Sequence, residues 1–338
     1  MQSERLSKSI PTHISKYTPV LAVIDIGTNT LRLLIGYFEG ERLVRIATER
    51  AVTRLGRDLV RTCLLHPDSI KKSITSLKKF KRKCEKYSVH KIFAVGTSAL
   101  RDAKNSYNFL EQAKKYTGLD ISIISGDEEA DLTLKGIYCG IPPKDISLSN
   151  RSVIVDIGGG SIEWIICNKG CIKDSIPIGA VKLYETFVKH DPPLLNELNN
   201  MKSFIAEQVA MSFLKHNFDI KNLLKPFSKY LIVTGGTATT IAAVDMGLES
   251  YDGDKIHLHK ISLPALKEIY KKIIMLPLNK RCKVKGLEPE RADIIIPGML
   301  ILITMKGILK IKKIIISDYG LLEGILMSFK NTIPRLYQ

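Results

Sequence analysis

The sequence lacks the marks of a zinc-finger protein, a secreted protein and a membrane protein. None of its cysteines, which stand at positions 63, 84, 139, 167, 171 and 282, forms a CxxC pair of the zinc-binding kind. The longest apolar run, residues 294–305, is too short for a transmembrane helix, and its Pro297 and Gly298 favour a buried helix. Residues 1–19 lack the apolar core of a signal peptide and are typical of a polar tail. We therefore expect a cytoplasmic protein that contacts no membrane.

Neither the cysteines nor the histidines indicate a metal site. Cys167 and Cys171 flank Asn168-Lys169-Gly170, which is typical of a turn between two strands. A disulfide bond across that turn is one alternative, and free thiols in a reducing cytosol are the state that we expect. His257 and His259 would share one face of a strand, but without a nearby acid they would make a poor metal site.

Acidic residues are scarce beside basic ones: 34 Asp and Glu stand against 51 Lys and Arg, which gives a formal net charge of +17. Much of the excess lies at 71–72, 78–79 and 81–83, on a predicted amphipathic helix over residues 67–87. Such a helix either attracts a polyanion (nucleic acid, polyphosphate or a highly phosphorylated nucleotide) or presents a solvated face. Only Phe80 interleaves the lysines, and no helix-turn-helix or zinc-finger pattern is present, so no specific nucleic-acid recognition is expected.

What the chain does have is one short pattern in two copies, Asp25-Ile-Gly27 and Asp156-Ile-Gly-Gly-Gly160. Each copy follows an apolar run and precedes another, Leu31–Ile35 and Ile162–Ile166, which predicts a β-hairpin with glycine at the bend. The aspartate at the end of a buried strand can offer its carboxylate to a metal, and the N–H groups after the glycine can cradle phosphate. The duplication therefore indicates a nucleotide or phosphate chain clamped between two related halves.

The length of 338 residues is typical of two domains. Apolar runs that end in Gly, Ser or Asp and lead into a helix recur along the chain, for example at 121–124 before a helix from about residue 128. We expect a first domain over 20–142, a linker within 140–150 and a second domain over 150–320, with the final segment 321–338 packing back on the first. Glycine and hydroxyl residues gather at the strand ends 27–30, 158–161, 235–237 and 317–320. Because ligands of open α/β folds bind beyond the carboxyl ends of strands, these turns are expected to face one interdomain cleft.

Together these turns resemble the phosphate-1, phosphate-2 and adenosine-type motifs of the actin, sugar-kinase and heat-shock chaperone superfamily. Longer segments are similar, in the same order, to motifs of the exopolyphosphatase and guanosine pentaphosphate phosphohydrolase (Ppx/GppA) family, over residues 20–330. These segments are Asp25-Ile-Gly-Thr-Asn-Thr-Leu-Arg32, Thr97-Ser-Ala-Leu-Arg101, Ile124-Ser-Gly-Asp-Glu-Glu129-Ala, Asp156-Ile-Gly-Gly-Gly-Ser-Ile-Glu163 and Ser317-Asp-Tyr-Gly-Leu-Leu-Glu-Gly324. The chain resembles the short, two-domain form. The resemblance implies an α/β fold of two duplicated actin-like (ribonuclease H-like) domains with an interdomain cleft.

The resemblance also implies the activity. It is that of a Mg²⁺-dependent phosphoanhydride hydrolase, stimulated by K⁺, which releases terminal phosphate from inorganic polyphosphate or guanosine pentaphosphate by water attack in the cleft. This would place the protein in the stringent response. One alternative is an ATP-dependent kinase of the sugar-kinase type, which would need a sugar pocket and an adenine pocket. A second alternative is a non-enzymatic polyphosphate or alarmone sensor. For a soluble enzyme a two-fold homodimer is the commonest assembly.

The acidic residues are expected to have two roles, metal binding and activation of water. Asp25 and Asp156 are hard oxygen ligands suited to Mg²⁺, and turn formation is the alternative role for each. By resemblance, Glu129 is the catalytic glutamate that aligns or deprotonates water; an ordinary carboxylate at a helix N-terminus is the alternative. Glu163 matches a second acidic position that assists the metal or the water, so that Glu129, Asp156 and Glu163 form the expected catalytic set.

The expected phosphate-binding groups are backbone N–H groups, hydroxyls and two arginines. By resemblance, Arg32 and Arg101 clamp substrate phosphate with their planar guanidinium groups, while an arginine exposed on an edge strand is the alternative for Arg32. The other phosphate-binding residues are Gly27, Thr28, Asn29, Thr30, Gly158, Gly159, Gly160, Ser161, Gly235, Gly236 and Thr237.

Ile162 departs from the family pattern, which usually has threonine between the serine and the glutamate of the second copy. If strand alternation turns residue 162 away from the ligand, the change is an adjustment of packing. If it does not, a hydroxyl contact to the substrate or the metal is lost.

Overall fold

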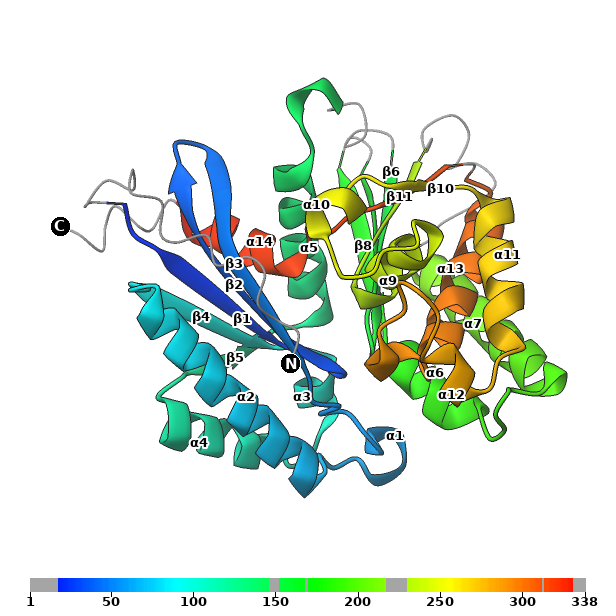
Figure 1. The fold of residues 1–338 in the computed structure, drawn as a ribbon, viewed down its shortest axis with the longest axis horizontal. Coiled ribbons are helices and arrows are strands. Elements are labelled where there is room, and N and C mark those ends of the chain that lie inside the picture. Colours follow the sequence, from blue (N-terminus) through cyan, green and yellow to red (C-terminus); the bar gives the residue numbers. More distant parts are fainter. Residues whose placement is uncertain (1–17, 146–151, 168–169, 217–229, 312, 331–338) are drawn as a thin grey trace. The chain divides into compact units, whose positions relative to one another are not determined.

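A computed structural model describes residues 18–145, 152–167, 170–216, 230–311 and 313–330. Most of the expected polar tail, part of the linker (146–150) and the end of the final segment (331–338) lie outside these residues. The chain is α/β and divides into two compact units. Unit 1 comprises Met1–Cys139 with Leu321–Gln338, and unit 2 comprises Gly140–Gly320 (Figure 1).

Unit 1 is built on a mixed sheet of order β3-β2-β1-β4-β5. The expected hairpin is β1 (Leu21–Ile26) and β2 (Thr30–Glu39), which pair antiparallel, and β3 (Arg42–Val52) pairs antiparallel with β2. On the other side of β1, β4 (Lys91–Gly96) and β5 (Ile121–Ile123) follow in parallel. The carboxyl ends of β1, β4 and β5 therefore share one edge of the sheet, and the loops after them lie there.

Helices cover both faces of this sheet because its strands alternate apolar residues to either side. Ala22 and Ile24 pack against α2 (Pro67–Lys86) and α4 (Ser106–Thr117) on one face. Leu21 and Val23 pack on the other face against α14 (Leu321–Phe329), beside α5 (Gly126–Gly140). The short helices α1 (Leu59–Thr62) and α3 (Ser98–Asp102) lie in the connections.

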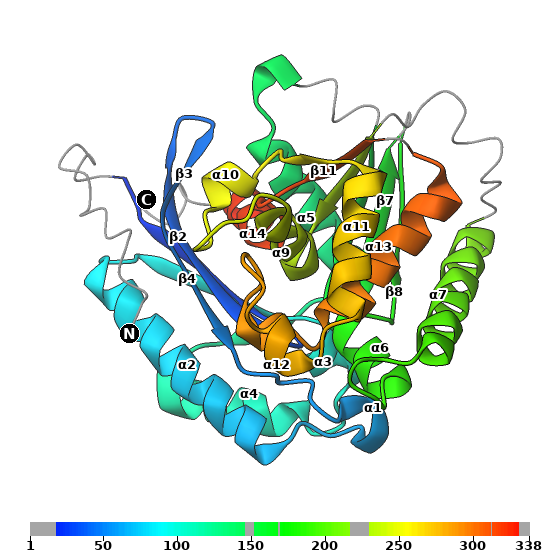
Figure 2. The same ribbon diagram turned by 45° about the vertical axis from the view of Figure 1, so that its right-hand side comes forward.

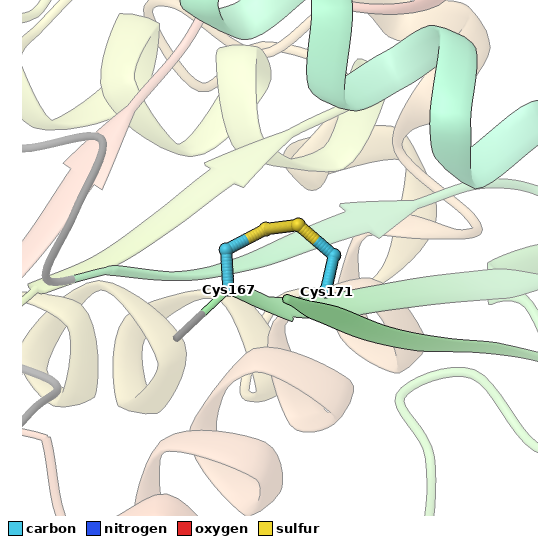
Figure 3. The surroundings of a disulfide bond; sticks show 2 residues. All are labelled: Cys167 and Cys171. Atoms are coloured by element: carbon cyan, nitrogen blue, oxygen red, sulfur yellow. A yellow bond between two sulfur atoms is a disulfide. The ribbon is translucent and has the colours of Figure 1, made fainter. Parts of the chain in front are cut away.

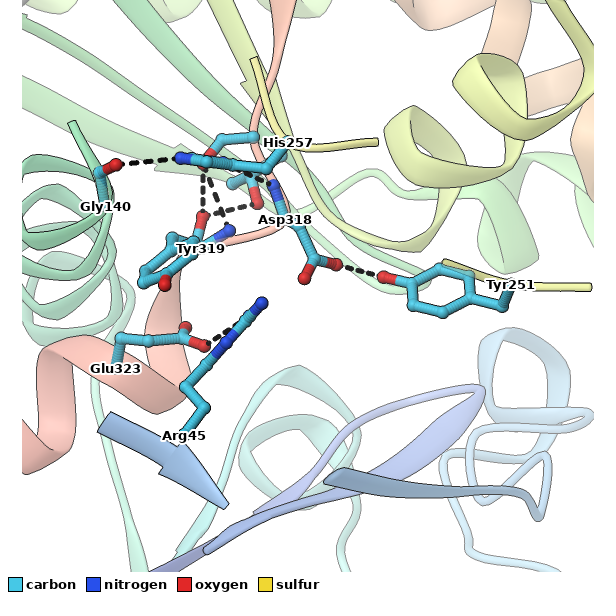
Figure 4. A network of polar contacts seen from close by, with 9 residues as sticks. Arg45, Gly140, Tyr251, His257, Asp318, Tyr319 and Glu323 are labelled. Carbon is cyan, nitrogen blue, oxygen red and sulfur yellow. Dashed lines mark hydrogen bonds and ion pairs between the residues drawn. The ribbon is translucent and has the colours of Figure 1, made fainter. Parts of the chain in front are cut away.

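The final helix α14 is fixed to unit 1 by its own motif residues. A Cβ at Gly324 would collide with the carbonyl oxygen of Leu132, so only glycine allows α14 to approach α5 this closely. Glu323, which is buried, forms an ion pair with Arg45 of β3 at 3.3 Å (Figure 4). The segment Leu-Leu-Glu-Gly at 321–324 thus holds α14 against α5 and β3 of unit 1.

Unit 2 repeats the strand order of unit 1. Its sheet runs β10-β11-β9-β6-β7-β8. The strands β6 (Ser152–Ile157), β7 (Ile162–Cys167) and β8 (Cys171–Ile176) pair antiparallel as β1, β2 and β3 do. The strands β9 (Tyr230–Thr234) and β11 (Lys313–Ile316) follow β6 in parallel as β4 and β5 follow β1, and β10 (Lys260–Ile261) is added at the edge. The duplication predicted from the two Asp-Ile-Gly copies is therefore a duplication of topology.

The helices of unit 2 enclose its main core. The predicted buried helix is α13 (Ile295–Leu309), which packs beside α7 (Leu195–Lys215), as Figures 1 and 2 both show. Its apolar residues are buried almost all round, which confirms that expectation. The other helical segments are α6 (Ala180–Phe187), α9 (Gly236–Asp245), α10 (Gly253–Ile256), α11 (Leu263–Ile274), α12 (Leu278–Arg281) and a 3-10 turn at Pro289–Arg291. No helix within the described residues is long and apolar enough to cross a membrane.

The prediction of free thiols at Cys167 and Cys171 is wrong. The two residues face each other at the ends of β7 and β8, with their Cα atoms 4.1 Å apart, and they form a disulfide bond (Figure 3). The expectation was based on the redox state of the cytosol, whereas the register of the hairpin brings the two sulfur atoms together. Residues 168 and 169 of the turn lie outside the described part of the chain.

Candidate functional site

The first Asp-Ile-Gly turn joins β1 to β2, and backbone hydrogen bonds connect it to the segment that follows β3. Gly27 N–H donates to the carbonyl of Thr30 at 3.3 Å, which closes the turn. The carbonyl of Thr28 accepts from Gly56 N–H at 2.8 Å, and that of Asn29 accepts from Arg54 N–H at 2.9 Å. The carbonyl oxygens of the turn are therefore bound within unit 1, which is the arrangement expected of a loop whose N–H groups serve a ligand.

The second turn, between β6 and β7, has the same construction. Gly158 N–H donates to the carbonyl of Ser161 at 3.0 Å. The carbonyls of Gly158 and Gly159 accept from Ala180 and Val181, at 3.0 and 2.9 Å, at the start of α6. Two turns far apart in the sequence thus share their closing bond and the way their carbonyl groups are held.

Asp25, at the foot of the first turn, is 3% exposed and pairs with Arg32 directly across the hairpin. Nε and Nη2 of Arg32 lie 2.9 and 2.7 Å from one carboxylate oxygen, Oδ2. The other oxygen, Oδ1, is buried and has no hydrogen-bond partner among the residues that the structure describes. Since β2 is an interior strand, Arg32 is not an arginine on a sheet edge, although about a third of its side chain (34%) is exposed.

In the second hairpin a glutamate takes the place of that arginine. Asp156 lies directly opposite Glu163, and both side chains are buried. Glu163 Oε1 accepts a hydrogen bond from Ser175 of β8 at 2.7 Å. Two carboxylates facing each other across a strand pair repel, and a cation or a shared proton between them relieves that repulsion.

The third turn lies against Asp156. Gly235, between β9 and α9, has a φ of +91°, and a Cβ there would lie 2.5 Å from Asp156 Oδ1. Glycine is therefore required both by its backbone conformation and by the approach of the carboxylate. At the next residue, the guanidinium group of Arg291 packs directly on Gly236 at the N-terminus of α9. The sequence did not point to Arg291 as a site residue. The one hint was its position just before the predicted buried helix at 294–305.

Glu129 lies in the first turn of α5, where it is 7% exposed. Its Oε2 forms an ion pair with Arg101 Nη1 of α3 at 2.8 Å, and the same nitrogen donates to the carbonyl of Ile124 at 2.8 Å. Arg101 therefore fixes the direction of the Glu129 carboxylate. Two residues that the sequence placed at separate strand ends are brought together in unit 1.

Glu128, the neighbour of Glu129, has a structural task. Ser125 N–H donates to Glu128 Oε2 at 2.7 Å, and Glu128 N–H donates to the Ser125 hydroxyl at 3.2 Å, which is a capping box. These bonds, first that of the Ser125 backbone, lower the pKa of Glu128. The cap makes α5 begin at Gly126 instead of residue 128, and it leaves Glu128 exposed and Glu129 buried.

The fourth turn, Ser317–Gly320, is bound to its surroundings by His257. Nε2 of His257 is 2.9 Å from the carbonyl of Gly140, Nδ1 accepts from Asp318 N–H at 3.3 Å, and the ring lies 4.6 Å from that of Tyr319 (Figure 4). Tyr251 donates to the Asp318 carboxylate. The strand predicted for His257 and His259 is wrong, because β10 begins at Lys260. His259 does have a nearby acid, Asp245, whose Oδ2 is 2.7 Å from its Nε2.

Ile162, the departure from the family pattern, is fully buried in the main core of unit 2. Alternation along β7 puts it on the face opposite Glu163, so it is a packing residue. We predict that Ile162→Thr lowers the free energy of unfolding by about 1–3 kcal/mol, because it buries a hydroxyl and removes packed atoms. Urea denaturation measures this, and kcat should stay at the wild-type value. A changed kcat with unchanged stability would contradict the assignment.

The described residues contain no group of three or more His, Cys, Asp or Glu side chains that could hold a metal ion. The carboxylates nonetheless fit Mg²⁺, which commonly takes one or two carboxylates and completes its shell with water and substrate phosphate. Asp25 has a buried oxygen that finds no hydrogen-bond partner within the described ranges, and Asp156 faces Glu163. These are the positions where a divalent cation would be stabilising.

Comparison with known proteins gives consistent matches. The model of the Ppx/GppA phosphatase family matches residues 38–332. The chain is 32% identical over 293 residues to a bifunctional 3-dehydroquinate synthase/phosphatase of Fusobacterium nucleatum, a match that covers 83% of this chain and 42% of that protein. It is 27% identical over 323 residues to exopolyphosphatase 2 of Mycobacterium tuberculosis, covering 91% of this chain and 98% of that one.

Two further matches concern a nucleotide enzyme and a solved structure. A guanosine-5'-triphosphate,3'-diphosphate pyrophosphatase of Vibrio atlanticus is 27% identical over 313 residues, which cover 91% of this chain and 58% of that protein. The crystal structure of the Aquifex aeolicus member of the Ppx/GppA family is 29% identical, with a TM-score of 0.74, and the match covers 94% of this chain and 99% of that one. The actin-like α/β fold expected from the sequence is therefore confirmed.

Proposed function

This chain belongs to the Ppx/GppA phosphatase family, and we propose that it releases terminal phosphate from inorganic polyphosphate or guanosine pentaphosphate by attack of water. The observation that carries the proposal is Glu129, a buried carboxylate aimed by Arg101 at the carboxyl edge of the unit 1 sheet. A phosphoryl transfer needs little covalent chemistry and depends on positioning and charge. A fixed carboxylate that accepts a hydrogen bond from water suits hydrolysis, whereas a kinase would shield the phosphate from water.

The turns supply the binding groups in this proposal. N–H groups of Thr28–Thr30 and of Gly159–Ser161 donate to phosphoryl oxygens, while those of Gly27 and Gly158 close the turns. Arg32 bonds Asp25 and, with about a third of its side chain exposed, brings a positive charge to the first turn. Arg291, whose Nε is paired with Glu288 at 3.1 Å, packs its guanidinium group beside the N-terminus of α9, where an anion is favoured.

We propose that Asp25 in unit 1, and Asp156 with Glu163 in unit 2, are the carboxylates that serve Mg²⁺. When bound, Mg²⁺ would neutralise charge on the phosphate chain. The orphan oxygen of Asp25 and the facing carboxylates of unit 2 support this assignment. Stimulation by K⁺ and assembly as a homodimer remain proposals from the family resemblance.

The names of relatives support both substrates. One relative is called an exopolyphosphatase and another a guanosine-5'-triphosphate,3'-diphosphate pyrophosphatase. Both compounds present the same kind of anionic phosphate chain to a site of N–H groups, arginines and carboxylates. The site as described therefore suits either substrate.

Phosphate release by the purified full chain tests the proposal. Long-chain polyphosphate, guanosine pentaphosphate and ATP are compared while Mg²⁺ and K⁺ are varied. We expect turnover of the first or second compound that depends on Mg²⁺ and is lost in Glu129→Gln. Hydrolysis of ATP alone would favour the kinase alternative. Tight binding of either phosphate compound without turnover would favour the sensor.

A further inference from the structure

The basic helix predicted from the sequence is α2, and it presents a row of cations. Of its eight basic residues, Lys83 forms an ion pair with Glu49. The others find no acidic partner among the residues that the structure describes. Six of them are exposed, and we call this group the basic ridge: Lys71, Lys72, Lys78, Lys79, Arg82 and Lys86. Asp68 stands four residues before Lys72, but within the described residues its carboxylate lies 3.7 Å from His66 Nδ1.

The ridge is narrow and long. At 3.6 residues per turn its six side chains fall within an arc of about 120°, and from Lys71 to Lys86 they span about 22 Å. Arg82 follows Lys78 and precedes Lys86 at helical spacing, so like charges stand next to each other and destabilise the isolated helix. The two acidic residues of α2, Asp68 and Glu85, stand in its first and last turns. An extended polyanion along the ridge would meet a cation at nearly every turn and would remove this repulsion.

The ridge continues onto the neighbouring helix α4. Nζ of Lys78 lies 4.5 Å from the centre of the exposed Tyr116 ring, and Nζ of Lys115 lies 5.5 Å from it. The ring therefore gathers two cations at the junction of α2 and α4. Because both lie on the ring, Tyr116 is already engaged and is a poor platform for a nucleic-acid base.

The ridge is separate from the carboxylates of unit 1. The inner side of α2 packs against Ala22 and Ile24 of β1, and the cations point away from the sheet. Asp25 alternates to the other face of β1, as Leu21 and Val23 do. A substrate confined to the turn after β1 would not touch the ridge, whereas a long chain bound there can extend onto other surfaces.

We propose that the basic ridge is a second binding surface for long-chain inorganic polyphosphate, outside the catalytic site. The inference deepens the proposed function and rests on polyphosphate being a substrate. A polyphosphate chain is a uniform linear anion without bases, which matches a row of cations that offers no stacking surface. Single-stranded nucleic acid would call for aromatic residues between the cations, and the exposed face of α2 has none.

The test neutralises the ridge in the full chain with Lys71→Gln, Lys72→Gln, Lys78→Gln, Lys79→Gln and Arg82→Gln. The matched control removes the same charge from exposed lysines of unit 2, with Lys267→Gln, Lys271→Gln, Lys272→Gln, Lys280→Gln and Lys283→Gln. Both sets are made in a Glu129→Gln background so that the ligand is not consumed. Fluorescence anisotropy then gives Kd for labelled long-chain polyphosphate and for tripolyphosphate over a range of salt concentrations. Thermal unfolding verifies the fold of each variant, and removal of like charges is expected to leave α2 at least as stable.

We expect the ridge variant to weaken binding of long-chain polyphosphate by about tenfold or more and to reduce the slope of log Kd against log salt by about 3. Tripolyphosphate binding should stay unchanged, and the control should lose less than the ridge variant for the long chain. An equal loss in both variants, or no loss in the ridge variant, would overturn the proposal. A competition experiment gives a further test, with an RNA oligonucleotide that carries the same number of phosphates as the polyphosphate. The proposal would also be overturned if this RNA displaced labelled polyphosphate at a lower concentration than unlabelled polyphosphate does. If the ridge binds polyphosphate while the wild type hydrolyses neither substrate, the proposed function fails, and the ridge is a polyphosphate-binding surface that serves no catalytic site.

Discussion

Glu129→Gln is expected to lower kcat by about 10²–10⁴-fold, the usual contribution of a general base, while substrate still binds. The amide keeps the size of the carboxylate but removes the charge that orients and deprotonates water. Since the charge of Arg101 is no longer balanced by a carboxylate, affinity for the phosphate chain should be equal or higher. Pre-steady-state phosphate release together with equilibrium binding separates the two effects.

Glu128→Gln is the matched control, because Glu128 is the same residue type at the adjacent position of the same helix. It is exposed and serves the capping box with Ser125, a role that glutamine can also fill. We expect kcat within a few-fold of wild type and nearly unchanged stability. Equal losses in Glu128→Gln and Glu129→Gln would show that the effect comes from the helix start, and wild-type turnover in Glu129→Gln would refute the base.

The features that the sequence predicted well are those set by local pattern. The two hairpins followed from apolar runs around Asp-Ile-Gly, and the basic helix expected over 67–87 is α2 at Pro67–Lys86. Alternation along β7 even settles the position of Ile162. The start of α5 could also have been predicted, since Ser125 and Glu128 stand at the spacing of a capping box.

The features that sequence reasoning missed depend on contacts between distant segments. Arg291 reaches Gly236 because the chain before α13 returns to the N-terminus of α9, and no local pattern encodes that return. The disulfide depends on the register of β7 and β8, which places Cys167 opposite Cys171. The pairing of Arg101 with Glu129 needs β4 and β5 to end at the same sheet edge. In each case the residue type was visible and its partner was not.

Asp156→Asn is expected to lower kcat by about 10²-fold, which corresponds to about 3 kcal/mol of lost transition-state stabilisation, and to raise the Mg²⁺ concentration needed for half-maximal rate. The reason is that Asp156 offers a buried carboxylate beside Glu163 and Gly235, where a divalent cation relieves repulsion. The same substitution removes one of two facing charges, so the metal-free variant should be as stable as wild type or more stable. Rates over a Mg²⁺ titration and urea unfolding in EDTA measure both effects.

Asp174→Asn separates a metal ligand from a buried aspartate that only stabilises the fold. Asp174 lies on β8 of the same sheet and accepts hydrogen bonds from Ser212 at 2.6 Å and Lys215 at 3.0 Å. Burial alone would raise its pKa, but these bonds and the charges of Lys215 and His216 outweigh burial and lower it. Its contribution to stability is therefore present above the ordinary pKa of aspartate and is lost as pH falls through the lowered value.

Asp174→Asn should reduce stability at neutral pH by about 1–3 kcal/mol and leave the Mg²⁺ dependence unchanged. If Asp156→Asn behaved in the same way as Asp174→Asn, with lost stability and an unshifted Mg²⁺ titration, Asp156 would be a structural residue and not a ligand.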